Sequence, residues 1–263
     1  MSCEGLSVKK RITAGTREWA DHNVNCVLGC YNNCKYCYAK VMAKRFGRAT
    51  DETWSHMVVR QKIKDKSYKK FSGRVMFPSS HDIIDFPTIE EACFNTLNRL
   101  LESRNEVLIT TKPRISIIKK IDKLFEAYKN HLQFRFTITS INNALLSFWE
   151  PNAPSFEERL EALKFAFGRQ YKTSVSIEPF LDRQPLFLIK RLQPFCTESI
   201  WIGKMNYIAA SNIRQEDMVF YENIRENYKI DNIQKIYSSL KDIPKIRFKD
   251  SILLKLAHAS SNS

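Results

Sequence analysis

The 263-residue sequence has no long apolar stretch. No run approaches the roughly 20 apolar residues that a membrane-spanning helix needs. The first residues, MSCEGLSVKKRITAG, lack the apolar core of a secretory signal. Internal repeats and low-complexity tracts are also missing. These absences predict a globular cytoplasmic protein with no membrane partner.

Acidic residues are scarce relative to basic ones. The chain has 28 Asp and Glu against 42 Lys and Arg, a formal net charge of +14. Residues 1–75 alone carry sixteen basic and six acidic residues, so most of the excess lies there. This asymmetry favours an anionic partner, either nucleic acid or a phosphorylated substrate. A solvated, Lys-rich surface is the alternative explanation.

A disulfide framework is not expected, because the seven cysteines are an odd number and four of them crowd between Cys26 and Cys37. This usage is typical of thiolate ligation in a reducing compartment. Paired knuckles separated by a longer loop, which most zinc sites have, are also missing. The cysteines therefore predict a metal centre other than a zinc finger.

Six short apolar runs predict strands, and helical patterns with apolar residues at three-to-four spacing separate them. The strands are expected at His22–Val27, Gly73–Phe77, Glu106–Thr111, Gln133–Thr139, Lys172–Glu178 and Glu198–Gly203. The helices are expected at Tyr38–Phe46, Thr88–Ser103, Pro113–Asn130, Ser155–Gln170 and Pro185–Leu192. Parallel strands joined by right-handed crossovers can curl into an incomplete barrel with its site at the strand carboxyl ends.

The boundaries follow from composition. Residues 1–19 form a basic lead-in, residues 20–213 the α/β core, and residues 214–263 a small helical extension. Within the core, the basic stretch 50–72 interrupts the alternation and is predicted to be an inserted arm. Ser155 and Glu158 match a capping box at the start of a helix. The extension is expected to contain helices at Arg214–Asn227, Asp231–Leu240 and Ser251–His258.

Cys30, Cys34 and Cys37 follow a C-x3-C-x2-C spacing between the first predicted strand and the first predicted helix. Three thiolates can hold three irons of a 4Fe-4S cubane and leave the fourth iron without a protein ligand. An open metal position is a place for chemistry. A rival trio of Cys26, Cys30 and Cys34 has plausible spacing, but burial of a thiol explains Cys26 without metal. Cys93 and Cys196 are likewise predicted to be buried thiols.

The same residues carry a family resemblance. C-x3-C-x-aromatic-C, with Tyr36 as the aromatic residue, is the signature of the radical S-adenosylmethionine (SAM) superfamily, and the neighbourhood resembles its spore photoproduct lyase-like subgroup. Further matching segments are 77–82, 110–112, 137–140, 150–155, 159–162 and 176–179, which together span roughly residues 20 to 203. The resemblance implies a partial (β/α)6 TIM barrel of the radical SAM type.

The resemblance also implies two cofactors, a 4Fe-4S cluster on Cys30, Cys34 and Cys37, and SAM. Residues at predicted strand ends would hold SAM: Ser79 and Ser80 at its amino group, Lys112 at its carboxylate, Thr139 and Ser140 near its ribose or carboxylate, and Tyr36 at its adenine. Lys112 precedes a predicted helix, where the helix dipole disfavours a cation, so a bound anion would explain it. A reductant such as flavodoxin or ferredoxin is the implied partner.

No catalytic residue is assigned, but His81, Asp82 and Glu178 are candidates. His81 and Asp82 can act as acid, base or substrate-orienting groups, although Asp82 equally suits a turn cap. Glu178 can hold SAM or substrate, or can lie at the sheet rim. In spore photoproduct lyase a cysteine outside the cluster donates hydrogen, and no cysteine here matches it, so photoproduct repair is not assigned.

The resemblance therefore implies a radical SAM enzyme that cleaves SAM to a 5'-deoxyadenosyl radical. Its substrate is unknown, with a nucleic acid or nucleotide-like anion favoured and a peptide left open. The alternative is a non-enzymatic iron-sulfur or zinc protein that binds nucleic acid through its basic arm.

Overall fold

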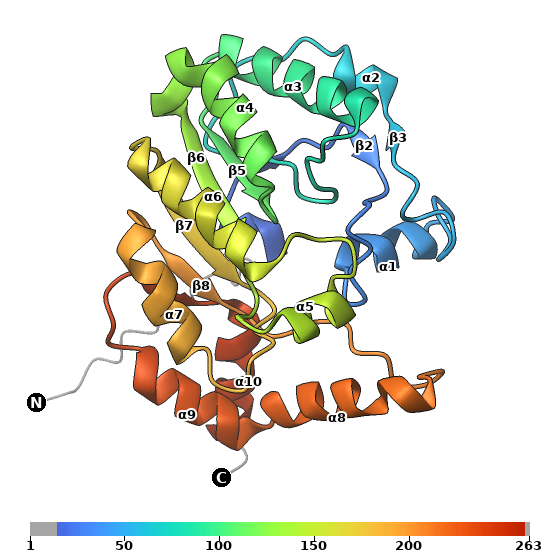
Figure 1. Cartoon of the computed structure of the whole chain (residues 1–263), viewed down its shortest axis with the longest axis vertical. Coiled ribbons are helices and arrows are strands. Elements are labelled where there is room, and N and C mark those ends of the chain that lie inside the picture. Colours follow the sequence, from blue (N-terminus) through green and yellow to red (C-terminus); the bar gives the residue numbers. More distant parts are fainter. Residues whose placement is uncertain (1–14, 261–263) are drawn as a thin grey trace, which may run out of the picture.

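The computed structural model describes residues 15–260, and its centre is a seven-stranded sheet in which every strand pair is parallel (Figure 1). Its order is β1-β4-β5-β6-β7-β8-β9. The strands are β1 (His22–Asn23), β4 (Val75–Phe77), β5 (Val107–Thr111), β6 (Leu132–Thr137), β7 (Lys172–Ile177), β8 (Ile200–Ile202) and β9 (Ile246–Phe248). The predicted α/β fold with parallel strands is confirmed.

The two faces of the sheet differ because side chains alternate along a strand. In β5, Val107 and Ile109 belong to the large apolar core, whereas Leu108 packs with Met76 and Trp19 on the other face. Helices cover the first face (Figure 1). The second face carries polar residues such as Arg135, so it forms the lining of a barrel interior.

The two sheet edges approach each other without pairing. Within residues 15–260, β1 and β9 share no ladder. Lys249, directly after β9, nevertheless pairs with Glu18, just ahead of β1, at 2.9 Å, and it donates to the Gly15 carbonyl at 3.0 Å. A curved sheet closed by side chains in this way is a partial barrel.

The helices lie largely where the apolar periodicity predicts them. They are α1 (Tyr38–Arg45), α2 (Gln61–Lys64), α3 (Pro87–Glu102), α4 (Ile115–Phe125), α5 (Asn143–Trp149), α6 (Phe156–Gly168), α7 (Leu186–Leu192), α8 (Met218–Asn227), α9 (Ile230–Leu240) and α10 (Asp250–Ser260). The Ser155 hydroxyl caps α6 by accepting from the Glu158 amide at 3.3 Å. The Glu158 carboxylate, however, accepts from Ile115 at the start of α4, so it joins two helices instead of completing a capping box.

The chain departs from the predicted elements in three places. The first predicted strand splits into β1 and β2 (Val27–Leu28), and β2 pairs antiparallel with β3 (Val58–Val59) of the basic arm. The predicted helical extension also contains β9, which lengthens the sheet by one strand. The helix α5 follows β6 where none was predicted. The three elements β2, β9 and α5 have only two to seven residues each, too few for a periodic pattern.

No helix among the described residues combines the length and apolarity needed to cross a membrane.

Candidate functional site

The cysteine loop lies between β2 and α1. Cys30 and Cys34 are buried, Cys37 is half-buried, and all three thiols are free. Cys37 directly precedes α1, so the positive end of the helix dipole lies beside it. Gly29 has φ +90°, and a Cβ there would come within 2.7 Å of the Trp54 and His56 carbonyls. The loop therefore needs glycine at its start and packs tightly on the basic arm.

Hydrogen bonds from distant segments fix the loop. Asn32 donates to the Asp82 carboxylate at 2.6 Å and accepts from Arg114 at 3.1 Å. The Lys35 amide donates to the Trp149 carbonyl at 2.9 Å. The loop that holds the thiols is thus tied to the loop after β4, to the start of α4 and to the end of α5.

The three thiols affect one another electrostatically. Burial, the Asp82 carboxylate and the neighbouring thiols raise the pKa of Cys30. Burial also raises the pKa of Cys34 to about 12, although the Lys112 charge acts in the opposite direction. Three neighbouring buried thiolates would need a compensating cation. Three free thiols on one fixed loop, with the start of a helix beside them, fit a cluster that leaves one iron open.

A second group of residues surrounds the buried carboxylate of Glu150. Tyr36 donates its hydroxyl to Glu150, and Thr139 donates to it at 2.8 Å. Lys112 Nζ lies 4.0 Å from the same oxygen. Burial alone would raise the pKa of Glu150, but the charges of Arg159 and Lys112 and these hydrogen bonds lower it. Glu150 is therefore a fixed anion that gathers three of the predicted SAM-binding residues.

Sequence reasoning did not single out Glu150 or Arg159. Both lie in segments that match the subgroup, and Arg159 falls on the otherwise apolar face of α6, where it is wholly buried. A charged residue at a core position of an amphipathic helix needs a partner. A charged residue on the apolar face of this predicted helix was therefore the sequence signal that could have identified Arg159 and a buried acidic partner.

Asp82 positions other residues. Its carboxylate accepts hydrogen bonds from the Thr111 hydroxyl and, at 2.9 Å each, from the amides of Ile83 and Lys112, in addition to Asn32. A carboxylate with this many donors has little capacity left for proton transfer. Through Asn32, Thr111 and Lys112, it connects the cysteine loop to the end of β5.

Ser79 and Ser80 are held by Asn25. The Asn25 side chain accepts from both backbone amides, at 2.7 and 2.9 Å, and donates to the Ser79 hydroxyl at 2.9 Å. The Tyr38 hydroxyl donates to the Ser79 carbonyl at 2.7 Å. The serine loop therefore lies beside the start of α1.

Three further predicted residues have partners of their own. The Ser140 hydroxyl donates to Asp182 at 2.5 Å. Glu178 lies 3.7 Å from Lys249, and burial raises its pKa in spite of that charge. The His81 ring faces Cys26 in the core. None of these three contacts involves Glu150.

Cys26 contacts residues other than the thiols of the cysteine loop. Its sulfur lies 3.8 Å from that of Cys93 and 4.0 Å from His81 Nε2. The Cys93 hydrogen bond, opposed by burial and assisted by His81, lowers the pKa of Cys26 to about 5. The arrangement does not support the rival trio of Cys26, Cys30 and Cys34.

The barrel interior contains unsatisfied polar atoms. Arg135 Nη1, Trp19 Nε1 and the Thr110 hydroxyl are buried and have no hydrogen-bond partner among residues 15–260. Arg135 and Thr110 are register neighbours on β6 and β5. The Arg135 guanidinium lies 4.6 Å from the centre of the Trp19 ring and 5.6 Å from that of Trp201. Because buried polar groups are normally paired, these donors fit a polar ligand.

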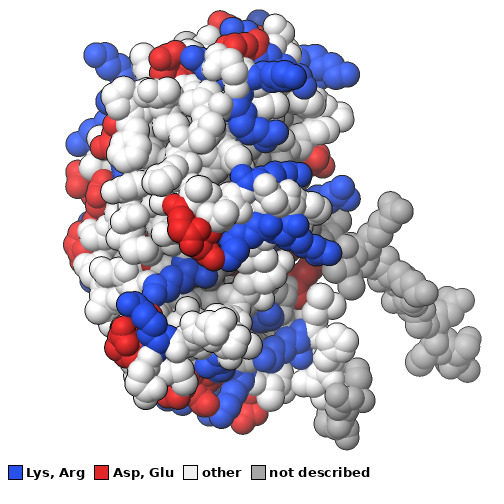
Figure 2. Space-filling model, turned by 90° about the vertical axis from the view of Figure 1, so that its right-hand side faces the viewer, with Lys and Arg blue, Asp and Glu red and all other residues white. Residues whose placement is uncertain are grey.

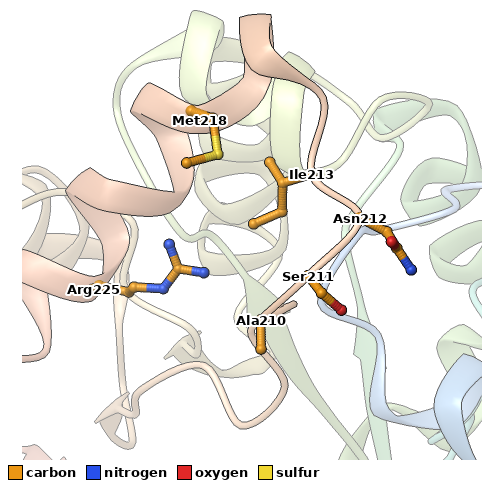
Figure 3. Close-up of a pocket in the computed structure, with 6 residues that line it drawn as sticks. All are labelled: Ala210, Ser211, Asn212, Ile213, Met218 and Arg225. Atoms are coloured by element: carbon orange, nitrogen blue, oxygen red, sulfur yellow. The ribbon is translucent and has the colours of Figure 1, made fainter.

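A pocket of about 390 Å³ lies between α8 and the loop that follows β8 (Figure 3). Figure 3 shows Met218 and Arg225 from α8 facing the loop residue Ile213. Arg225 donates to the Ala209 carbonyl at 2.7 Å. Arg225 is the one titratable side chain among its lining residues, so the pocket is not where the titratable groups converge.

Comparison with known proteins agrees with this geometry. The model of the radical SAM superfamily matches residues 24–182. An uncharacterized protein of Methanocaldococcus jannaschii is 26% identical over 230 residues, covering 86% of this chain and 85% of that protein. An uncharacterized protein of Acidianus two-tailed virus is 24% identical over 258 residues, covering 90% and 82%.

Among solved structures, spore photoproduct lyase complexed with dinucleoside spore photoproduct resembles the chain with a TM-score of 0.55 at 14% identity, covering 92% of this chain and 80% of that one. A mutant of the same enzyme with bound AdoMet and dinucleoside spore photoproduct gives a TM-score of 0.54 at 14% identity, with the same coverage. At this identity the likeness concerns the fold.

Proposed function

The chain belongs to the radical SAM superfamily, and we propose that it binds a 4Fe-4S cluster through Cys30, Cys34 and Cys37 and reductively cleaves SAM. The bound cluster supplies the electron that splits SAM into methionine and a 5'-deoxyadenosyl radical. The observation that carries this proposal is the contact between the cysteine loop and the Glu150 group, through the Tyr36 hydroxyl.

The residues around Glu150 are proposed to orient SAM. Lys112 is half-buried and charged, and its ammonium group can bind the SAM carboxylate. Glu150 holds that Lys112 ammonium group in place. Asn25 fixes the Ser79–Ser80 loop, so that loop can approach the SAM amino group. Thr139 is proposed to contact the SAM ribose and Tyr36 the adenine. Ser140, in the loop that follows β6, is proposed to contact the ribose or the carboxylate.

The interior donors support an anionic substrate. Arg135, which lies beside two tryptophan rings, would satisfy its free Nη1 on a carboxylate or phosphate, and the rings offer surfaces for a base or other flat group. Glu178 and Lys249, which pair at the carboxyl ends of β7 and β9, are proposed to contact polar groups of the substrate. We favour a nucleotide-like substrate because spore photoproduct lyase, which shares the fold, binds a dinucleoside.

The basic arm is proposed to recruit nucleic acid. Lys62, Lys69 and Lys70 are exposed, whereas Lys64 pairs with Glu91 at 2.8 Å. Figure 2 views the side of the molecule that carries α1, α2 and β3, and Lys and Arg side chains gather there in a broken band. Such a surface attracts phosphates from a distance. An acidic electron carrier such as flavodoxin or ferredoxin is proposed as the reductant, and the cytoplasm as the compartment.

Anaerobic reconstitution tests the proposal. Protein loaded with iron and sulfide, then supplied with SAM and dithionite, is expected to release 5'-deoxyadenosine. If iron-loaded protein with intact Cys30, Cys34 and Cys37 releases none, the chain is not a radical SAM enzyme. Nucleic-acid binding without turnover would instead indicate the non-enzymatic alternative.

A further inference from the structure

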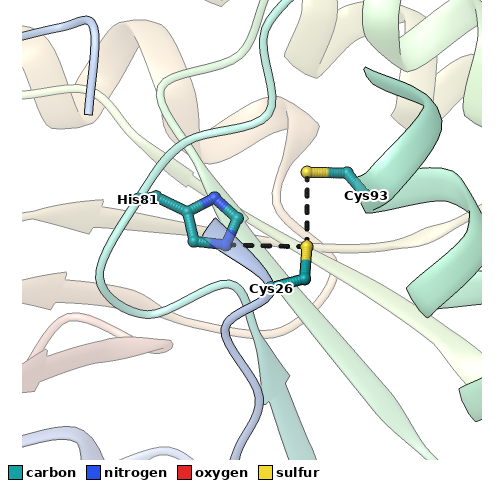
Figure 4. A group of neighbouring side chains, drawn as sticks. All are labelled: Cys26, His81 and Cys93. Carbon is teal, nitrogen blue, oxygen red and sulfur yellow. Dashed lines mark hydrogen bonds between the residues drawn. The ribbon is translucent and has the colours of Figure 1, made fainter. Parts of the chain in front are cut away.

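A second group of metal-ligating side chains lies outside the cluster loop. Cys26 precedes β2, His81 follows β4, and Cys93 lies in α3. Figure 4 shows the three side chains converging, and their ligand atoms all lie within 4.8 Å of one another. Both cysteines are wholly buried, and His81 is 7% exposed. Three segments far apart in the sequence thus bring two sulfurs and an imidazole together in the core.

The tautomer of His81 is set by its other nitrogen. His81 Nδ1 lies 3.2 Å from the Asp82 carbonyl oxygen, which can only accept. In the tautomer whose Nδ1 carries the proton, Nδ1 donates to this carbonyl and Nε2 keeps a lone pair for a metal ion beside the Cys26 sulfur, 4.0 Å away. Metal-binding histidines usually have this arrangement, with one nitrogen on the metal and the other donating to a carbonyl.

The spacing of the two sulfurs fits a tetrahedral ion. With Zn–S bonds of about 2.3 Å, tetrahedral angles place two thiolates about 3.8 Å apart. The Cys26 and Cys93 sulfurs are 3.8 Å apart. That separation is far longer than the roughly 2.04 Å of a disulfide bond.

Charge balance selects a divalent cation. Two thiolates and a neutral imidazole neutralise a dication, whereas a monovalent ion would leave a net negative charge in the core. Zn²⁺ prefers thiolate and imidazole ligands of this kind. A water molecule would complete four ligands.

We propose that Cys26, His81 and Cys93 bind a Zn²⁺ ion in the core, separate from the cluster held by Cys30, Cys34 and Cys37. The ion joins α3 to the segment that leads into the cluster loop, four residues before Cys30, and to the loop that carries Ser79 and Ser80. Its role is structural, because it fixes the relative positions of the two loops that hold the cluster and SAM.

Metal analysis of the full chain tests the site. Protein reconstituted anaerobically with its cluster, given equimolar Zn²⁺ and freed of excess metal, is expected to retain about one zinc per chain. Cys26→Ser and Cys93→Ser should each weaken zinc binding at least about tenfold while iron content stays unchanged. The matched control is Cys196→Ser, because Cys196 is also buried and its thiol donates to the Leu192 carbonyl, so it should leave zinc unchanged.

X-ray absorption at the zinc edge of the unmutated protein identifies the ligands directly. This test needs no substitution, so a variant that fails to fold cannot affect it. The expected spectrum has two sulfur neighbours and a histidine nitrogen, and His81→Ala should remove the nitrogen. Three outcomes would overturn the proposal: no retained zinc, a three-sulfur shell that reports zinc in the cluster site, or a Cys26–Cys93 disulfide found after anaerobic alkylation.

Discussion

The Arg159 guanidinium and the Glu150 carboxylate lie 2.6 Å apart, Nη2 to Oε2, with both side chains wholly buried. Arg159 is itself held by the Pro154 carbonyl at 2.8 Å. This pair fixes one oxygen of Glu150, so the other oxygen faces Tyr36, Thr139 and Lys112. The ion pair is therefore the support on which the proposed SAM site rests.

Glu150→Gln should destabilise the fold. The substitution leaves the Arg159 charge buried without a counterion, which typically costs about 3–5 kcal/mol in the free energy of unfolding. Chemical denaturation of the anaerobic protein measures it. Glu161→Gln is the control, since Glu161 lies on the same helix as Arg159 but its side chain is 60% exposed, and its change should stay within about 0.5 kcal/mol. Equal effects of the two substitutions would rule out the supporting role.

The same carboxylate predicts a pH dependence. The pKa of Glu150 is lower in the folded protein than the ordinary value of 4.5. A lowered pKa means that its contribution to stability is fully present above pH 4.5 and is lost as the pH falls through the folded value. The unmutated protein should therefore lose stability below pH 4.5 more steeply than Glu150→Gln. Parallel curves from pH 6 down to pH 3 would contradict this.

Lys112→Met should weaken SAM binding. Removing a hydrogen bond between charged groups costs about 1.5–3 kcal/mol, which corresponds to about a 10- to 100-fold higher Kd. Equilibrium dialysis with the iron-loaded protein measures it. Lys119→Met, at a side chain that is 55% exposed, is the matched control and should bind SAM normally. A fall in iron content with unchanged SAM affinity would mean that Lys112 serves the cluster loop instead.

Neutralising the basic arm should reduce the salt dependence of nucleic-acid binding. We expect the triple change of Lys62, Lys69 and Lys70 to Gln to lower the slope of log affinity against log salt by about 0.7–0.9 for each phosphate that the arm no longer neutralises. Binding of a DNA oligonucleotide across a salt series measures this. The control neutralises the exposed Lys119, Lys123 and Lys172. Indistinguishable slopes for the two triple variants would reject the arm as the recruiter.

Much of the fold could be predicted from the sequence because β5, β6 and β7 are segments of five or six residues rich in Val, Ile, Phe and Thr, and helices with apolar residues at three-to-four spacing separate them. The strand β9 could not, because three residues give no measurable period and its pairing with β8 is set by tertiary contacts. The split of the first predicted strand depends on β3, whose pairing with β2 is not visible in either segment alone.

The site was predictable where chemistry is local and less so where it is assembled from afar. Cys30, Cys34 and Cys37 lie within eight consecutive residues, so their spacing alone indicated a shared metal. Glu150 acquires its role only through Arg159 and Tyr36, which the fold brings together. The sequence position of His81 predicts a place at the strand-end site, but its ring points into the core toward Cys26. This could not be predicted, because a sequence motif does not report the direction of a side chain.

The most direct test is SAM cleavage by three iron-reconstituted proteins under anaerobic conditions with dithionite. The unmutated chain and Cys196→Ala, which removes a buried thiol far from the loop in sequence, should both release 5'-deoxyadenosine, whereas Cys34→Ala should bind less iron and release none. Product from Cys34→Ala at the normal rate, or no product from the fully iron-loaded unmutated protein, would contradict the assignment of Cys30, Cys34 and Cys37 as the cluster ligands of a radical SAM enzyme.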